Sequence, residues 1–335
     1  MGLSLTDDNR YTLMVSPMID LSIAIVSYNT KELLLDCIRS IHAHTTAITF
    51  EVIVVDNDSR DGTVAALKEA YPATKIIANT DNRGFAKAVN QAVAVSRGRH
   101  VLLLNSDTIV RDQALATMAG YLDSHPEVGA VSCKQWTGEG HLSRTCYPFP
   151  SLRDHLCYFR LFQRVAPRMQ AAAAAMQAVD CTLSQDVDWA NGACLMVRTA
   201  LVRQLGGLDE EFFMYFEDVD LCRRLRQQGH RVRHVAEAEI VHFIGRSSGR
   251  DREHLQLAWE FSRIRYVEKH FSPVKRWLMK VWIAGGTGWR LVQLIWCAPP
   301  ARRRRIESCL ATIRRLWNRP QSVEPARAYS SGPQG

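Results

Sequence analysis

Three carboxylates lie within four positions of the chain, directly after a run of bulky apolar side chains. The acids are Glu217, Asp218 and Asp220, and the apolar run covers residues 212–216. An acid that packs against aromatic rings loses contact with water, which raises its pKa towards the range of a general base. A solvated helix start would explain the acids through the helix dipole, but not the aromatic residues beside them. We therefore predict that Asp218 and Glu217 belong to a catalytic site.

A second candidate cluster combines a carboxylate with an imidazole. Asn105, Ser106 and Asp107 end a buried apolar run, and His242 closes the last predicted strand. A carboxylate that shares a cation with phosphate oxygens suits Mg²⁺ or Mn²⁺, and neutral imidazole is a common metal ligand. Two alternatives stay open, because an Asp after a strand is often a helix cap and a lone His is often structural.

Two further strand ends carry groups that suit a nucleotide. Asp56 and Asn57 offer the hydrogen-bond donors and acceptors that reading a nucleobase edge requires. Tyr28, beside Asn29, offers an aromatic face on which a base can stack, for about 1–3 kcal/mol. A single Tyr at a strand end is also ordinary half-buried packing, so this feature alone decides nothing.

The elements that must position these residues alternate between strand and helix from residue 20 to about 110. The expected strands cover residues 21–26, 52–55, 76–77 and 101–104, and the expected helices cover 31–41, 63–70 and 84–96. This alternation predicts an α/β fold with a mostly parallel central sheet covered by helices. Ligands of such sheets bind beyond the carboxyl ends of the strands, which places Tyr28, Asp56 and Asp107 on one rim.

The second half of the chain is less regular before the pattern returns. Residues 133–188 are interrupted by prolines, and we expect an excursion whose helices lie beside the site. Residues 189–197 and 232–241 then read as strands, and 199–205 and 217–228 as helices. Arg246, Ser247 and Ser248 lie in a glycine-bracketed loop and are candidate donors to phosphate oxygens.

Charge and cysteine content restrict the class of partner and the redox compartment that we expect. The net charge is +8, and residues 246–335 hold 18 Lys and Arg against 6 Asp and Glu. Such a basic segment favours an anionic surface as partner. Nine cysteines without a Cys-x-x-Cys pair favour reduced thiols over a zinc cluster or a disulfide framework. No secretory signal is apparent, so we expect a cytoplasmic protein.

The basic C-terminal segment, residues 271–335, also carries tryptophans with helical spacing. A spanning helix needs about 20 predominantly apolar residues, and Lys280 and Arg290 interrupt the stretch. We expect a helix that lies in the membrane interface, beside the basic run 302–305. The alternative is an amphipathic helix that docks on the protein's own core. Glycines at 285, 286 and 288 argue against one continuous helix.

Five motifs in order resemble family 2 inverting glycosyltransferases of the GT-A fold, most of all their bacterial rhamnosyltransferase-like members. The motifs are residues 26–29 (VSYN), 56–59 (DNDS), 82–86 (NRGFA) with Asn90, 105–107 (NSD), and 213–221 (FMYFEDVDL) with Arg224 and Gly229. Each motif alone is weak, and their common order is specific. The resemblance covers about residues 19–270.

The resemblance implies a role for each motif. Asp218 matches the catalytic base, with Glu217 beside it, and Asp107 matches the aspartate that binds the metal, completed in some relatives by a histidine, here His242. The remaining matches imply nucleotide-sugar binding by Ser27, Tyr28, Asn29, Asp56, Asn57, Arg83, Gly84, Asn105 and Ser106. Asn105 replaces the first acid of the family's D-x-D motif, which puts the strictness of the metal requirement in doubt.

The resemblance also implies a function. We expect a sugar, best matched by rhamnose from dTDP-rhamnose, to move to a saccharide or polyprenyl-diphosphate-linked acceptor, with Mg²⁺ or Mn²⁺ as cofactor. A UDP-hexose donor or a non-catalytic nucleotide-sugar-binding scaffold is the alternative. A nucleotidyltransferase is disfavoured, because this sequence has no glycine-rich phosphate loop near its N-terminus, and no motif supports nucleic-acid binding. The expected organisation is an extension (1–19), a transferase domain (20–270, its nucleotide half ending at 110), and a basic tail (271–335) on the inner face of the plasma membrane.

Overall fold

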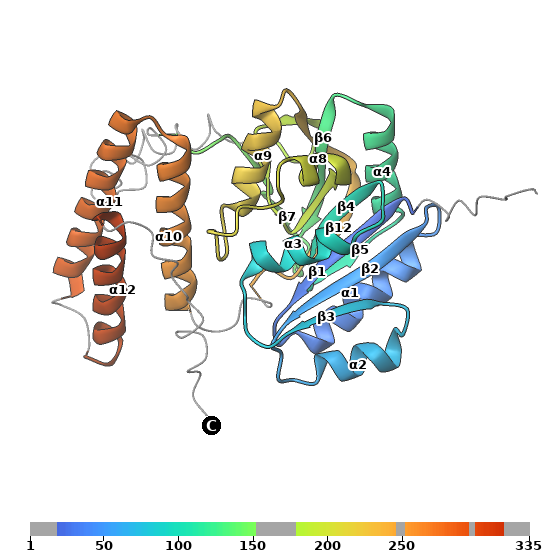
Figure 1. Ribbon diagram of the computed structural model, residues 1–335, viewed down its shortest axis with the longest axis horizontal. Helices are drawn as coiled ribbons and strands as arrows, with labels where there is room; N and C mark the ends of the chain where they lie inside the picture. The colour runs from blue at the N-terminus through green and yellow to red at the C-terminus, as the bar shows by residue number, and fades with distance from the viewer. Residues whose placement is uncertain (1–18, 152–178, 246–251, 295–298, 318–335) are drawn as a thin grey trace, which may run out of the picture.

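The computed structural model describes residues 19–151, 179–245, 252–294 and 299–317. Within these residues a ten-stranded sheet has the strand order β3-β2-β1-β4-β11-β6-β12-β5, with β7 and β9 paired at its side (Figure 1). Strands β1 to β4 are mutually parallel, whereas β11 runs antiparallel to both β4 and β6. The predicted α/β fold with a mostly parallel sheet is therefore confirmed, with mixed pairing in its second half.

The first half follows the predicted alternation. Its elements are β1 (Leu21–Ser27), α1 (Lys31–His44), β2 (Phe50–Asn57), α2 (Thr63–Ala70), β3 (Lys75–Asn79), α3 (Phe85–Val95) and β4 (His100–Asn105). The second half contains β5 (Thr108–Val110), α4 (Ala114–Ser124), β6 (Val128–Trp136), β7 (Leu142–Ser143), β8 (Cys146–Tyr147), β9 (Gln185–Val187), β10 (Trp189–Ala190), β11 (Cys194–Arg198), α8 (Thr199–Gln204), α9 (Glu217–Gln227) and β12 (Arg231–His242). The excursion expected over 133–188 contains strand segments and loops where it is described; residues 152–178, where its helices were expected, lie outside the described residues.

Alternating side chains of the strands build two cores, one on each face of the sheet. On β1, Ile23 and Ile25 pack towards α1 and α4, whereas Ala24 packs towards α3. Because both faces are covered, the central strands are nearly continuous apolar runs, as parallel strands in α/β proteins are. The register then aligns the strand ends: Ser27 lies opposite Asp56, and Val26 opposite Asn105. The carboxyl ends of β1, β2 and β4 therefore lie along one rim of the sheet, as the sequence predicted.

The C-terminal helices form a third cluster with the segment that leads into α9. They are α10 (Arg252–His270), α11 (Pro273–Leu294) and α12 (Pro299–Trp317), and they stand together beside the α/β body (Figure 1). Met279 and Ile283 of α11 and Leu316 of α12 are buried with Phe212 and Tyr266. One face of the basic segment therefore docks on the protein's own core, as the alternative interpretation held.

Two further features concern the helices of this segment. Helix α11 is continuous through its glycines, contrary to prediction, because burial of Met279, Ile283 and Thr287 along one face outweighs the low helix propensity of glycine. Among the described residues no helix is long and apolar enough to cross a membrane.

Candidate active site

The carboxyl ends of β1 and β4 are joined by hydroxyl groups. Ser27 and Thr30 share a hydrogen bond of 3.1 Å, and the Thr30 hydroxyl donates to Ser106 over the same distance. Asn29 adopts a positive φ of 54°, and its side-chain oxygen accepts a hydrogen bond from the Arg60 backbone. Ser27, Asn29 and Ser106 thus shape the rim through contacts within the protein, whereas Tyr28 lies half-buried between them.

Asp56 and Asn57 differ in what they leave available to a ligand. The Asn57 amide donates to Asn82 and Gly84 and accepts from Asn79, so it is committed to holding the next motif in place. Asp56 is also buried; its Oδ2 accepts a hydrogen bond from the backbone of Ser59 over 2.9 Å, while its Oδ1 has no hydrogen-bond partner among the described residues. A buried acceptor without a donor is costly, so Asp56 Oδ1 is the group here that a ligand donor would satisfy.

The Arg83–Gly84 motif connects the nucleotide half to the acidic segment. Gly84 has a φ of +81°, and a Cβ at this position would lie 2.5 Å from the carbonyl oxygen of Phe213. The next residue, Phe85, donates its backbone N–H to that same oxygen over 2.7 Å. Glycine is therefore required here by close approach as well as by conformation. The exposed Arg83 pairs with Asp81.

The predicted metal ligands lie together. His242 Nε2 is 3.3 Å from Asp107 Oδ1 and 3.4 Å from the Asn105 amide, and both Asp107 and His242 are buried. Asp107 precedes strand β5 rather than a helix, so the alternative of a helix cap is excluded. Adjacent ligands of one octahedral cation at 2.1 Å lie about 3 Å apart. A carboxylate oxygen and an imidazole nitrogen with this spacing fit two ligand positions of Mg²⁺ or Mn²⁺.

The two acids that begin α9 differ in burial and in the hydrogen bonds of their carboxylates. Asp218 is half-buried, and its carboxylate accepts backbone hydrogen bonds from Gly192 and Val219, each 2.8 Å long. Glu217 is buried, and within the part of the chain that the structure describes its Oε2 has no hydrogen-bond partner. Burial raises the pKa of both groups, and the charge of Asp218 raises that of Glu217 further. Of the two, Glu217 has the more strongly raised pKa, whereas the two backbone hydrogen bonds of Asp218 favour its charged form and oppose the effect of burial.

The backbone before these acids is strained. Tyr215 and Phe216 have φ values of 72° and 67°, a conformation that costs bulky residues free energy and that clusters at functional sites. Of the aromatic residues before the acids, Phe216 contacts Trp259 and Tyr266 of α10, and these contacts fasten the turn to that helix.

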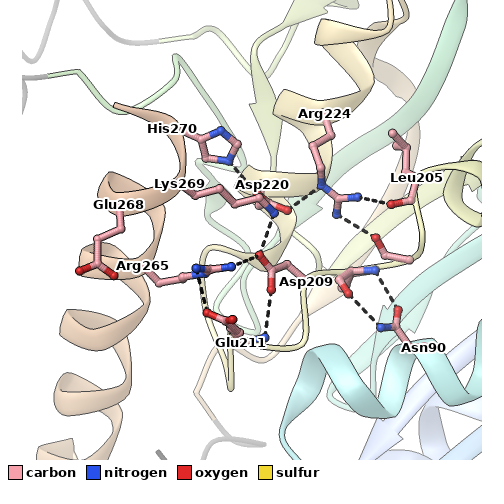
Figure 2. Close-up of polar contacts among 12 residues, drawn as sticks. Asn90, Leu205, Asp209, Glu211, Asp220, Arg224, Arg265, Glu268, Lys269 and His270 are labelled. Atoms are coloured by element: carbon pink, nitrogen blue, oxygen red, sulfur yellow. Dashed lines mark hydrogen bonds and ion pairs between the residues drawn. The ribbon is translucent and has the colours of Figure 1, made fainter. Parts of the chain in front are cut away.

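Asp220, the third acid, anchors α9 to α10 (Figure 2). Its fully buried carboxylate contacts Arg224 at 2.7 Å, Lys269 at 2.8 Å and His270 at 2.6 Å. These contacts, with His270 foremost, overcome the effect of burial and lower the pKa of Asp220 to about 2. Asp220 is thus a structural ion and Asp218 the acid that remains available for chemistry.

A short backbone path joins the base candidate to the metal candidates. Gly192 contacts Asp218, and the neighbouring Ala193 accepts a hydrogen bond from the Asn105 backbone over 3.0 Å. Gly192 and His270 were missed from the sequence. For Gly192 the available signal was the Asn191-Gly192-Ala193 segment between β10 and β11.

Comparison with known proteins agrees with this geometry. Residues 17–278 match the family described as glycosyltransferase like family 2. The chain belongs to glycosyltransferase family 2. The family 2 chain is 29% identical over 244 residues to the N-acetylglucosaminyl-diphospho-decaprenol L-rhamnosyltransferase of Mycobacterium tuberculosis, which covers 68% of this chain and 79% of that protein. It is 27% identical over 170 residues to the rhamnosyltransferase WbbL of Escherichia coli, with 48% and 61% covered.

Solved structures of other glycosyltransferases share its fold. The mannosyltransferase of Pyrobaculum calidifontis, in complex with GDP-Man and Mn²⁺, superposes with a TM-score of 0.53 at 17% identity over 94% of this chain and 84% of that one. TarS of S. aureus, in complex with UDP-GlcNAc, gives a TM-score of 0.52 at 16% identity over 89% and 82%. The predicted GT-A type fold is confirmed. Arg246, Ser247 and Ser248, the predicted phosphate donors, lie outside the described residues.

Proposed function

We propose that this family 2 glycosyltransferase moves rhamnose from dTDP-rhamnose to a polyprenyl-diphosphate-linked saccharide, with inversion at the anomeric carbon. The observation that carries the proposal is the Asp218 carboxylate, oriented by two backbone N–H groups and linked through Gly192 and Ala193 to the Asp107–His242 pair. The rhamnosyltransferase activity and the diphospho-decaprenol acceptor named for the Mycobacterium tuberculosis relative support the choice of sugar and acceptor.

In this reaction Asp218 takes the proton of the acceptor hydroxyl as the oxygen attacks the anomeric carbon, and the bond from that carbon to the diphosphate breaks. A general base in this role accelerates the reaction by on the order of 10²–10⁴-fold. Asp107 and His242 would hold a divalent cation, which when bound neutralises charge on the departing diphosphate. Gly192 keeps the Asp218 oxygens pointed at the acceptor, and positioning of this kind supplies much of the remaining acceleration.

For the nucleobase, Asp56 Oδ1 is the selective group. A buried carboxylate oxygen without a partner accepts the imide N–H that thymine and uracil share. Asn57 stands where many UDP-sugar enzymes carry an aspartate, and this difference favours the dTDP-sugar. Tyr28, half-buried at the same rim, offers the ring for stacking.

The binding test uses thermal shift with dTDP-rhamnose, UDP-glucose, UDP-galactose and GDP-mannose, each with and without Mn²⁺. We expect dTDP-rhamnose to raise the melting temperature most, and Mn²⁺ to enlarge the shift. A larger shift with another donor would overturn the assignment of the sugar. If a donor stabilises the protein but no transfer follows, the non-catalytic scaffold becomes the better interpretation, and if no donor stabilises the folded protein, the proposed donors are wrong.

We further propose that α11 brings the enzyme to the membrane surface where a lipid-linked acceptor resides. Opposite its buried face the helix exposes an apolar stripe with helical spacing, formed by Val274, Trp277, Leu278, Val281, Trp289 and Val292. An exposed apolar stripe in a basic segment is the arrangement of helices that lie in the membrane interface, with tryptophan at headgroup depth. One helix thus docks on the core with one face and meets lipid with the other.

A further inference from the structure

A second group of metal-ligating side chains lies away from the rim of the parallel strands. Cys146 of β8, Cys181 and His234 of β12 are buried, and their ligand atoms all lie within 4.8 Å of one another. The three residues are far apart in the sequence, which is why cysteine spacing gave no sign of them. The functions proposed above use none of them.

The imidazole of His234 is oriented as a metal ligand. Its Nε2 lies 2.9 Å from the carbonyl oxygen of Cys181, so Nε2 carries the proton and Nδ1 presents its lone pair to the cluster. A hydrogen bond from the second ring nitrogen to a backbone carbonyl is the usual support of a histidine that binds a metal. Nδ1 faces Cys146 Sγ at 3.3 Å and the Ser132 hydroxyl at 3.2 Å.

The spacing and chemistry of the group select zinc. With Zn–S near 2.3 Å and Zn–N near 2.05 Å, tetrahedral ligands lie about 3.6 Å apart. The distance from Cys146 Sγ to His234 Nδ1 is 3.3 Å, and Ser132 Oγ lies 3.7 Å from the same sulfur at a possible fourth position. Two thiols with one imidazole are soft ligands of the zinc type, unlike the oxygen-rich set around Asp107.

We propose that Cys146, Cys181 and His234 bind a structural zinc ion. Binding would release the two thiol protons and join β8, β12 and the chain at Cys181. The Thr145 carbonyl accepts a hydrogen bond from Asn191, the residue before the Gly192 that orients Asp218. The ion would therefore stabilise the wall beside the catalytic carboxylate without touching the substrate. This inference does not depend on the proposed donor or acceptor.

The metal content of the purified full-length chain tests the proposal. After expression with added zinc and extensive dialysis, we expect one zinc per chain, and its loss in Cys181→Ser and in His234→Ala. Cys194→Ser is the matched control, because Cys194 is also buried but lies on β11, outside the cluster. Asp107→Asn should keep the zinc, which separates this ion from any cation at the nucleotide site.

A measurement on the wild-type chain covers the case in which the variants fail to fold. Titration of the metal-free protein with Co²⁺ should produce a thiolate-to-cobalt absorption band that zinc abolishes. Absence of both bound zinc and the cobalt band would overturn the proposal. A non-reduced intact mass lighter by two hydrogens would also overturn it, since it would show a disulfide between Cys146 and Cys181.

Discussion

The backbone N–H of Gly192 donates to Asp218 Oδ2 over 2.8 Å, although 26 residues separate the two in the chain. This bond stabilises the charged form of Asp218 at the place where burial opposes it. A Cβ on Gly192 would contact the Asp218 Cβ at 3.5 Å, so the turn and the carboxylate are packed against each other. The hydrogen bond and the close packing together hold the Asp218 carboxylate in one orientation.

Replacement of the two adjacent acids should separate their roles. Asp218→Asn removes the base and should reduce kcat by about 10²–10⁴-fold while donor binding is kept. Glu217→Gln preserves the shape of a buried side chain whose raised pKa disfavours its charged form, so kcat should fall by no more than about tenfold. Steady-state rates and donor affinity of both variants are the measurement. An Asp218→Asn enzyme that transfers sugar at the wild-type rate would refute the assignment of the base.

Loss of the imidazole at the rim should weaken metal binding. His242→Ala removes one of the groups that approach Asp107 Oδ1, and the Mn²⁺ concentration needed for half-maximal transfer should rise on the order of tenfold or more. His141→Ala, at an exposed position, serves as the control. Equal Mn²⁺ requirements in the two variants would exclude His242 from the metal site.

The buried Asp220 should matter for stability rather than for chemistry. Asp220→Asn leaves the charges of Arg224 and Lys269 without their shared partner and should lower the free energy of unfolding by about 3–5 kcal/mol. Asp36→Asn breaks an exposed helix pair with Arg39 and should cost less than about 1 kcal/mol. Urea unfolding at pH 7 compares the two.

The same carboxylate should also govern acid unfolding. Its pKa falls from 3.8 to about 2 on folding, so its stabilising contribution is complete above pH 4 and is lost as the pH falls towards 2. The wild-type protein should lose stability steeply in this window, and Asp220→Asn less steeply. Parallel stability–pH curves for the two proteins would contradict the role given to Asp220.

Membrane association should depend on the exposed stripe of α11. A double Trp277→Ala and Trp289→Ala variant should bind anionic vesicles at least tenfold more weakly. Both side chains are exposed in the protein, and each large apolar side chain that enters the membrane interface contributes about 1.5–3 kcal/mol to binding. Leu183→Ala removes an equally exposed apolar side chain elsewhere and should bind as the wild type does. Vesicle co-sedimentation measures this, and undiminished binding of the double variant would remove α11 from the interface.

Local patterns sufficed for most elements of the transferase domain. Helix α2 occupies the predicted residues, Thr63–Ala70, because a turn sequence and helical periodicity are adjacent in the chain. The same logic placed Asp56 and Asp107 at the ends of buried strands, and parallel pairing brings such ends to one rim. Asp218 was recognised because it follows an aromatic run within one short segment.

Contacts between distant segments were decided by the tertiary structure alone. The division of labour between Asp218 and Asp220 depends on Gly192 and His270, which reach the two acids from other elements. The glycines of α11 are helical because one face of that helix is buried. Cys146, Cys181 and His234 meet only once β8 and β12 are in place. Periodicity and turn chemistry are encoded by neighbours in the sequence, whereas side-chain partners are set by the packing of elements that the sequence keeps far apart.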